Sequence, residues 1–310
     1  MEIYHSESEI SERRPAAVAL GFFDGLHLGH TALITDCVSF ARARALSADV
    51  FTFRDHPKNV MSGELIIPRL MTEAEKLSRL EALGVDRVFD FDFSDRFHAM
   101  PPEDFAKALL TDTFSAEAVF CGFNFRFGAD AAGTPAILKE FGVAYGFAAH
   151  VIGPVYIADR LVSSTLIRRS INLGDVEPAA RLLGREYSLT GIVEKGRGRG
   201  HGFGFPTANF SPAPGMTLPA SGVYITDAFT DGKRHPSVSN IGVCPTIKPE
   251  GALRIETHLL DRDMDLYGKE IKVDFHKMLR KERHFENTEA LKRQIAADAQ
   301  KARWFFLERS

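Results

Sequence analysis

The sequence predicts two folds in one chain. The first is an α/β domain with a doubly wound parallel sheet, and the second is a small β-barrel with a terminal α-helix. In the first half, apolar runs alternate with helical patterns, which is typical of a parallel sheet covered by helices. From Tyr187 onward, short apolar runs are broken by Gly, Pro and Asp at regular spacing, which favours a barrel. We place the domains at 1–183 and 184–310.

Each element of the first domain follows from a local pattern. A buried strand is predicted at 16–20, further strands at 49–53, 85–93 and 116–121, and helices at 31–46, from Thr72 and from Pro101. Ligands of a doubly wound sheet bind at the carboxyl ends of its strands. We therefore expect the segments that follow the first, second and fourth of these strands to form a site.

The second domain is predicted from shorter runs. Strands are expected at 188–194, 222–229, 236–243, 254–260 and 270–275. A terminal helix is expected at 287–308, because Leu291, Ile295 and Ala299 stripe one helical face.

Composition excludes several classes of protein. The 310 residues are 45% hydrophobic and 25% charged, which is ordinary for a soluble globular protein. A net charge of −3 provides no basic field for nucleic acid, so a phosphorylated ligand must be held by local groups. No run of eighteen apolar residues is present, and we expect no membrane partner. The oligomeric state, including a homo-oligomer, stays open.

The cysteines indicate a reducing compartment. Cys37, Cys121 and Cys244 are few, odd in number and far apart. We expect them to be small packing residues in a cytoplasmic protein.

The stretch from Gly21 to His30 reads Gly-Phe-Phe-Asp-Gly-Leu-His-Leu-Gly-His and joins a strand to a helix. Glycines allow the backbone to approach a ligand, and a helix N-terminus attracts phosphate. The stretch is neither a Walker loop nor a dinucleotide fingerprint. The alternatives for His27 and His30 are that they are packing residues or that they form half of a zinc site. A zinc site needs two further ligands at short spacing, and the sequence has none nearby.

This motif resembles that of the HxGH nucleotidyltransferases, which cleave a nucleoside triphosphate between its α and β phosphates. The resemblance implies that His27 and His30 are catalytic and donate to the α-phosphate in the transition state. It extends to Gly122–Gly128, which is similar to a segment of FMN adenylyltransferases, although Asn124 and Ala131 stand where many relatives have Asp and Arg. It also extends to Ser163–Arg168, which is similar to the segment that holds the β and γ phosphates.

The implied sites of the first domain are as follows. The expected ATP contacts are Gly21, Phe22, Asp24, Gly25, His27, Gly29, His30, Asn124, Ser163, Ser164, Thr165 and Arg168. The expected flavin contacts are Phe53, His56, Pro57, Asn124, Phe125 and Arg126. For Phe123, Phe125 and Phe127 taken singly, a core position is the plainer interpretation.

The second domain contains a run of glycines and arginines that ends in Phe-Pro-Thr-Ala-Asn at 205–209. An RNA-binding Arg-Gly tract is one interpretation, but the run is short and occurs once. A phosphate-binding loop is the other. Thr207 and Asn209 lie two apart on an extended segment, so they face one side and offer oxygens suited to Mg²⁺.

This segment resembles the Gly-Phe-Pro-Thr-Ala-Asn motif of riboflavin kinases, and Ser239–Gly242, Glu256–Asp261 and Leu279–Glu282 follow in register. The resemblance implies that Glu256 is the catalytic base that deprotonates the ribityl hydroxyl of riboflavin. His201 stands where many relatives have Arg. The expected ATP contacts are Gly196, Gly198, Arg199, Gly204, Pro206, Thr207 and Asn209, with Thr207 and Asn209 also holding Mg²⁺.

Together the two halves resemble the bacterial bifunctional riboflavin kinases/FMN adenylyltransferases. The implied partners are riboflavin, FMN, FAD and ATP, with ATP as co-substrate and Mg²⁺ as cofactor. Two alternatives stay open at this point. One is nucleotide transfer to pantetheine phosphate or glycerol phosphate, and the other is a flavin-nucleotide sensor without turnover.

Overall fold

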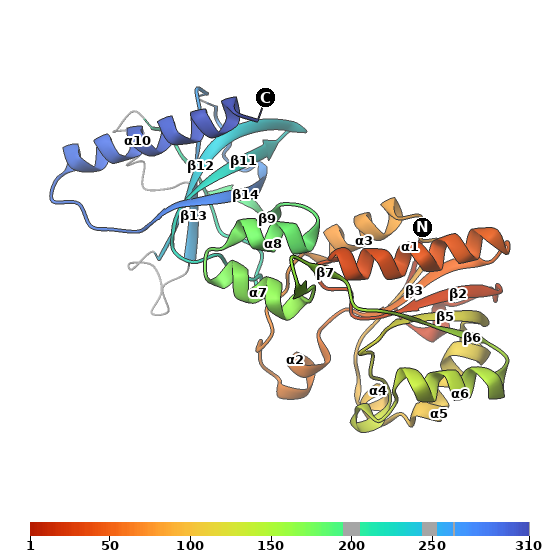
Figure 1. Ribbon diagram of the computed structural model, residues 1–310. Coiled ribbons are helices and arrows are strands. Elements are labelled where there is room, and N and C mark those ends of the chain that lie inside the picture. The colour runs from red at the N-terminus through yellow and green to blue at the C-terminus, as the bar shows by residue number, and fades with distance from the viewer. Residues whose placement is uncertain (195–204, 244–252, 263, 310) are drawn as a thin grey trace. The chain divides into compact units, whose positions relative to one another are not determined.

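The computed structural model describes residues 1–194, 205–243, 253–262 and 264–309. Contacts between Cα atoms divide the chain into two units, Met1–Ser163 and Ser164–Ser310. Each unit has its own sheet (Figure 1), and each has its own hydrophobic core. Among the described residues, no helix is long and apolar enough to cross a membrane.

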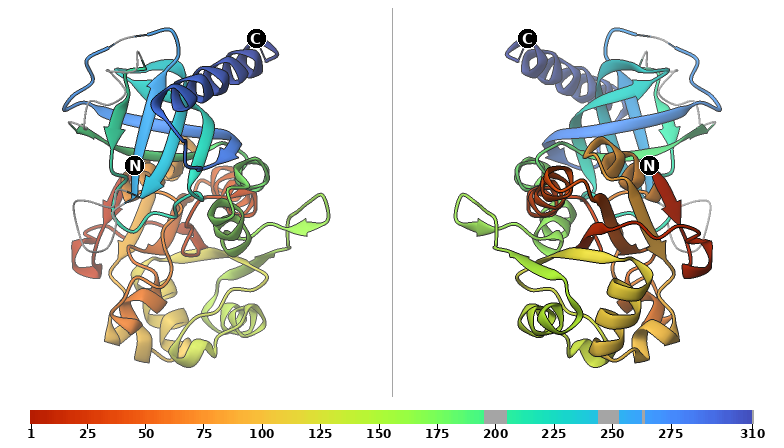
Figure 2. Two further views of the ribbon diagram at one scale, coloured as in Figure 1. Left: turned by 90° about the vertical axis from the view of Figure 1, so that its left-hand side faces the viewer. Right: turned by 90° about the vertical axis from the view of Figure 1, so that its right-hand side faces the viewer.

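The first unit is built on a six-stranded parallel sheet. Its strands are β1 (Glu2–Tyr4), β2 (Ala16–Leu20), β3 (Ser47–Phe53), β4 (Arg87–Phe91), β5 (Ala116–Gly122) and β6 (Ala148–Ile152). Its helices are α1 (Leu28–Ala43), α2 (Pro57–Ser62), α3 (Glu73–Ala82), α4 (Asp95–Ala99), α5 (Pro102–Asp104), a π-helix (Phe105–Thr113) and α6 (Pro135–Tyr145), with 3-10 turns at Glu7–Glu9 and Ala129–Ala131. A hairpin of β7 (Tyr156–Ile157) and β8 (Arg160–Leu161) extends away from the sheet (Figure 2).

The strand order of the sheet is β1-β4-β3-β2-β5-β6. The chain runs from β2 through β3 to β4 on one side, and then returns to β5 on the other side of β2. The carboxyl ends of β2 and β5 therefore form a topological switch point, which is where doubly wound sheets bind ligands. This confirms the predicted sheet, and it locates the segments Gly21–His30 and Gly122–Gly128 at the expected edge.

Helices cover both faces of the sheet because successive strand residues face opposite sides. On one face, Leu33, Ile34 and Cys37 of α1 pack with Ala17 and Ala19 of β2. On the other face, helical and strand side chains form a phenylalanine-rich core; its members include Val18, Leu20, Phe51, Phe89, Phe91, Phe105, Leu109, Phe114 and Phe127. The two cores hold the central strands rigid, and so hold the loops at their carboxyl ends.

The second unit is a closed antiparallel barrel preceded by two helices. The elements are α7 (Ser164–Asn172), α8 (Val176–Leu183), β9 (Tyr187–Glu194), β10 (Ala208–Phe210), β11 (Gly222–Thr230), β12 (Lys233–Val243), β13 (Leu253–Leu259), β14 (Glu270–Lys281) and α10 (Thr288–Leu307). Around the barrel the order is β10-β13-β12-β11-β14-β9. The barrel and its terminal helix confirm the predicted fold class. The predicted domain boundary at 183/184 falls at the end of α8, and it stays a prediction.

The inside of the barrel contains a chain of hydroxyl groups as well as apolar side chains. The Thr226 hydroxyl is 2.8 Å from that of Ser237 and 2.9 Å from that of Ser239, and Ser239 is 2.8 Å from Thr257. All four side chains are fully buried. Because each hydroxyl has a partner, the network adds no unsatisfied polar group to the core.

The outside of the barrel is covered in part by α10. Ile225 and Leu260 pack against Ala299 and Ala302 of this helix. The alternation along β11 thus sends Tyr224 and Thr226 inward and Ile225 outward. The helix begins after Asn287, whose Oδ1 accepts the Ala290 N–H at 2.9 Å, close to the predicted start.

Several short or irregular elements were not expected from the sequence. β1 and β10 have three residues each, too few for a recognisable alternation, and β6 was not predicted either. The strand expected at 270–275 continues to Lys281, because β11 pairs with β14 from Lys272 to Lys281 through two irregularities. The helix after Pro101 changes into a π-helix that ends at Thr113.

A charged cluster lies on the outer side of the barrel beneath the end of α10. His276 Nε2 is 2.8 Å from Asp227 Oδ2, and its Nδ1 is 3.1 Å from Glu186 Oε1. The rings of Phe305 and Phe306 contact the imidazole at centroid distances of 5.6 and 5.7 Å. Burial lowers the pKa of His276, but its hydrogen bonds to Asp227 and Glu186 outweigh burial and raise the pKa to about 9.

The raised pKa of His276 predicts that the stability of the barrel depends on pH. An unfolded histidine has a pKa of about 6.5, so the folded state gains stability from His276 protonation that is complete below that pH. This gain is lost as pH rises through about 9. Urea unfolding followed by the fluorescence of Trp304, the single tryptophan, should show a midpoint that falls between pH 6.5 and 9.5.

The variant His276→Gln is the control, since a glutamine side chain does not titrate. Its unfolding midpoint should depend much less on pH over this interval. An equally steep dependence in this variant would assign the effect to other groups.

Candidate active sites

The loop that follows β2 has a backbone conformation suited to an anion. Phe23, Gly25 and Leu26 have φ angles of 53°, 79° and 36°, which lie in or near the left-handed region. Two of these residues are not glycine, so the loop is strained, and such strain concentrates at functional sites. Thr52 of β3 holds the loop, because its hydroxyl donates to the Phe22 carbonyl at 3.0 Å.

His27 is the N-cap of α1. Its Nδ1 accepts the backbone N–H of His30 at 3.2 Å, and its side chain is buried. A histidine nitrogen that accepts a hydrogen bond carries no proton, so neutral His27 has its proton on Nε2. The helix start thus selects the tautomer that leaves Nε2–H as the donor.

His27 and His30 act as one geometric unit. Their rings stack at a centroid distance of 3.6 Å with planes inclined by 19°. The edge of the buried Phe23 ring contacts His30 at 5.3 Å, which limits its rotation. A Cβ on Gly29 would lie 3.3 Å from two atoms of the His27 ring, so glycine leaves this ring the space that it uses.

Asp24 has a structural partner within the same unit. Its Oδ1 accepts the Leu70 N–H at 2.9 Å, and its side chain is buried. The carboxylate therefore joins the loop after β2 to the segment before α3. The sequence motif contained Asp24 but offered no indication of this contact, because Leu70 is 46 residues away.

The residues predicted to contact flavin follow β3. His56 is the N-cap of α2, since its Nδ1 accepts the Lys58 N–H at 3.1 Å, and Pro57 is the first helical residue. The His56 ring meets Phe22 edge-on at 4.8 Å, so the loops after β2 and β3 are in contact. Phe53 is half-buried and packs on the phenylalanine core.

The segment after β5 divides its three phenylalanines between core and surface. Phe127 is buried against Phe105 at 5.0 Å, and Phe125 is half-buried and stacks on Phe127 at 5.7 Å. Phe123 is 43% exposed, so the core interpretation holds for Phe127 and not for Phe123. Asn124 and Arg126 are exposed beside them.

The segment predicted to hold the β and γ phosphates begins a helix. Ser163 is the last residue of the first unit, and α7 begins at Ser164 in the second. Thr165 is exposed and Arg168 is half-buried within the first two turns of α7.

In the barrel, three neighbouring strands align the predicted base with two asparagines. Glu256 of β13 is directly opposite Asn209 of β10 and Asn240 of β12. Directly opposite residues share a face, and their Cβ atoms are about 5 Å apart. Glu256 is exposed whereas Thr257 points into the barrel, so these three side chains belong to the outer face.

Thr207 and Asn209 face the same side, as the extended segment predicted. Asn209 Nδ2 donates to Thr207 Oγ1 at 3.2 Å. The hydroxyl oxygen of Thr207 and the amide oxygen of Asn209 are hard ligands of the kind that Mg²⁺ prefers. Pro206 is described as well, whereas Gly196, Gly198, Arg199, His201 and Gly204 of the predicted phosphate loop lie outside the described residues.

Some neighbours of these residues were not singled out from the sequence. Asn240 flanks Glu256, and its Nδ2 is 3.3 Å from Glu282 Oε1. His258 contacts Pro206, and it lies two residues after Glu256, a spacing that places both on one face of a strand. That spacing was the signal available in the sequence.

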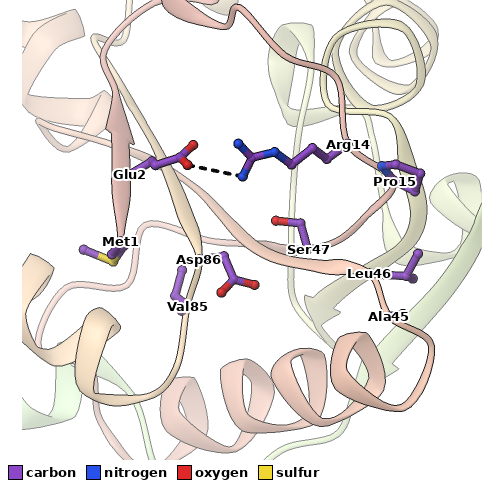
Figure 3. Close-up of a pocket in the computed structure, with 9 residues that line it drawn as sticks. All are labelled: Met1, Glu2, Arg14, Pro15, Ala45, Leu46, Ser47, Val85 and Asp86. Atoms are coloured by element: carbon purple, nitrogen blue, oxygen red, sulfur yellow. Dashed lines mark hydrogen bonds and ion pairs between the residues drawn. The ribbon is translucent and has the colours of Figure 1, made fainter.

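A pocket of about 460 Å³ lies at the amino ends of the strands, opposite the loop after β2 (Figure 3). Its polar side chains already have protein partners: Glu2 pairs with Arg14, and Ser47 donates to Asp49. The pocket is therefore not the ligand site that the sequence predicts. In the part of the chain that the structure describes, no group of three or more His, Cys, Asp or Glu side chains forms a metal site.

The cysteines also agree with the sequence interpretation. Cys37 and Cys121 are buried and free, and Cys244 lies outside the described residues. Burial raises the pKa of Cys121 to about 11, and it raises the pKa of Cys37 further. Both thiols are packing residues, because a protonated buried thiol is unreactive.

Family models match both parts of the chain. A model of FAD synthetase matches residues 9–166, and a model of riboflavin kinase matches residues 183–306. With the α/β unit and the barrel, these matches define a flavin-nucleotide-forming enzyme with two catalytic modules.

Relatives with both modules are similar over nearly the whole chain. The bifunctional riboflavin kinase/FMN adenylyltransferase of Pseudomonas fluorescens is 34% identical over 292 residues, covering 94% of this chain and 93% of the relative. The protein of the same name from Bacillus subtilis strain 168 is 33% identical over 311 residues, covering 99% and 98%. The chain belongs to the bifunctional riboflavin kinase/FMN adenylyltransferase family. It phosphorylates riboflavin to FMN and adenylylates FMN to FAD.

A solved structure is also similar over almost the full length. It comes from Streptococcus pneumoniae and is described as a macrolide-efflux protein, with a TM-score of 0.89 and 28% identity. It covers 97% of this chain, and this chain covers 98% of it. The arrangement of the strands and helices is therefore shared with a crystal structure.

The close approach of the His27 ring to Gly29 leads to a testable prediction. Gly29→Ala adds a Cβ that lies 3.3 Å from the His27 ring and displaces it by a few tenths of an ångström. Misplaced catalytic groups are costly, so FAD formation from FMN should fall roughly 10-fold. Phosphorylation of riboflavin should not change.

Gly153→Ala is the matched control, because a Cβ there has nothing within 4 Å. Its rate of FAD formation should equal that of the unmodified enzyme. Steady-state assays of both variants at saturating FMN measure this. A normal rate for Gly29→Ala would mean that the orientation of His27 does not matter.

Proposed function

We propose that His27 and His30 stabilise the α-phosphate of ATP during adenylylation. A phosphate oxygen of FMN attacks the α-phosphorus, the bond between the α and β phosphates breaks, and pyrophosphate leaves with its electron pair. Negative charge develops on the α-phosphate oxygens as this happens. One preorganised donor to such charge is worth roughly 3 kcal/mol.

The observation that carries this proposal is the contact between His27 Nδ1 and the His30 N–H. It leaves the Nε2–H of neutral His27 as a donor at the positive end of α1. The stacked rings hold His30 beside it. No proton has to be transferred to or from either histidine for this role.

The remaining contacts of the first module are proposed from the motifs and the strand ends. Gly21, Phe22, Gly25 and Gly29 would let the backbone approach the triphosphate, and Asp24 would hold the loop by its bond to Leu70. Asn124 would contact the nucleotide. The proposed ligands of the outer phosphates are Ser163, Ser164, Thr165 and Arg168, and the proposed flavin contacts are Phe53, His56, Pro57, Asn124, Phe125 and Arg126.

For the kinase reaction, we propose Glu256 as the general base. It would take the proton from the ribityl 5′-hydroxyl while that oxygen attacks the γ-phosphorus of ATP and ADP leaves. An ionised carboxylate is able to accept this proton. Support comes from its exposed position between Asn209 and Asn240 on the outer face of the barrel.

Thr207 and Asn209 are the proposed ligands of Mg²⁺ in the kinase module. When bound, the ion neutralises phosphate charge on ATP. Pro206 would continue the ATP contacts, together with Gly196, Gly198, Arg199 and Gly204. The two functional modules are proposed at 1–183 and 184–310, and the enzyme is proposed to be cytoplasmic, where ATP is available.

The proposal predicts that the two reactions can be lost separately. His27→Ala or His30→Ala should lower FAD formation about 100-fold and leave riboflavin phosphorylation unchanged. Glu256→Gln, Thr207→Ala or Asn209→Ala should do the reverse. Chromatographic separation of riboflavin, FMN and FAD measures phosphorylation in samples that start from riboflavin and adenylylation in samples that start from FMN, each incubated with ATP and Mg²⁺.

FAD formation from supplied FMN serves as the folding control for the kinase variants. Phosphorylation of riboflavin serves as the control for the histidine variants. If a folded variant with one substitution loses both reactions, the two sites are not independent and the assignment fails.

A further inference from the structure

The sheet ladder that carries Asn209 ends one residue short of Thr207. β10 pairs with β13 from Phe210 to Ala208, and the last pair is Ala208 with Thr257. Continuing this register would bring Thr207 opposite His258. Among the residues that the structure describes, neither strand pairing of β10 extends to Pro206 or Thr207, so a side-chain contact is what holds them there.

The side chain of His258 provides this contact. Its Nδ1 is 2.9 Å from the carbonyl oxygen of Pro206. A carbonyl can only accept, so Nδ1 carries the proton and donates. The His258 ring also meets Phe205 edge-on, at a centroid distance of 5.4 Å and an angle of 80°.

This hydrogen bond acts on the peptide group next to Thr207. The Pro206 carbonyl belongs to the planar peptide that joins Pro206 to Thr207, so fixing its oxygen fixes that plane. From there a second bond, Asn209 Nδ2 to Thr207 Oγ1 at 3.2 Å, continues to the next side chain. One chain of contacts thus joins His258 to both side chains proposed to hold Mg²⁺.

We propose that His258 is a positioning residue of the kinase reaction, which holds residues 205–209 in the conformation that presents Thr207 and Asn209 to Mg²⁺ and ATP. This rests on the proposed roles of Thr207 and Asn209. His258 neither touches the reacting atoms nor transfers a proton. It shares the outer face of β13 with Glu256, so one strand supplies the base and the support of the metal ligands.

Two substitutions separate the hydrogen bond from the packing. His258→Phe keeps a ring against Phe205 but has no donor. His258→Asn has a side-chain N–H that can occupy the place of Nδ1, although it has no ring. If the bond is what matters, the phenylalanine variant is impaired and the asparagine variant keeps most of the function.

The first measurement is hydrogen exchange of the ligand-free full-length enzyme. Peptides covering 205–210 should exchange about 10-fold faster in His258→Phe than in the unmodified enzyme, because one hydrogen bond that resists local opening is lost. The same peptides of His258→Asn should exchange at nearly the original rate. This readout needs neither metal nor activity.

The second measurement is riboflavin consumption as a function of MgATP. Loss of a residue that orients metal ligands typically weakens metal binding about 10-fold or more. His258→Phe should therefore raise the KM for MgATP about 10-fold with little change in kcat, and His258→Asn should restore most of the loss. FAD formation from FMN should be the same in both variants.

Normal exchange and a normal KM in His258→Phe would overturn the proposal. Equal impairment of both variants would also overturn it, because packing rather than the hydrogen bond would then be responsible. Glu256→Gln tests the kinase assignment separately. If that variant still phosphorylates riboflavin, the assignment of the base fails, whereas the exchange result for His258 stands independently.

Discussion

The hydrogen bond from the His30 N–H to His27 Nδ1 connects the fold of the first unit to its chemistry. A helix must satisfy its first N–H groups, and here a catalytic candidate does so in place of the usual Ser, Thr or Asp. The same bond sets the tautomer of His27, stacks the two rings and requires a small residue at Gly29. A substitution that alters the start of α1 therefore also alters the position of the His27 donor.

In the barrel, the alternation of side chains along each strand places structural residues on the inner face and the candidate catalytic residues on the outer face. Inward residues such as Thr226 and Thr257 belong to a chain of hydrogen-bonded hydroxyls, while Glu256, the neighbour of Thr257 on β13, faces outward. A one-residue shift in register would exchange these roles. Closure of the barrel fixes the register, because every strand has two neighbours. The alignment of Asn209, Glu256 and Asn240 is thus a consequence of the fold.

Local patterns were sufficient for the long elements and for the motifs. The unbroken apolar run at Ala16–Leu20 became β2, and the glycines of Gly21–His30 became the strained loop and helix start. Short elements such as β1 and β10 escaped prediction, because three residues carry too little periodicity. The hydrogen-bond partner of Asp24 was not predicted either, because a contact between distant segments has no signature in the local sequence of either segment.

The order of residues along the chain determined which chemistry is available: two histidines three apart after a glycine turn, and a Thr and an Asn two apart after a proline. These spacings place side chains on the same face because a helix repeats every 3.6 residues and a strand every 2 residues. Both periods are properties of the backbone alone. Tertiary structure decided what meets across the chain, such as His258 with Pro206 and His56 with Phe22. These tertiary contacts depend on which strands are adjacent in the sheet. Strand order is determined by the packing of the whole core and not by any single segment.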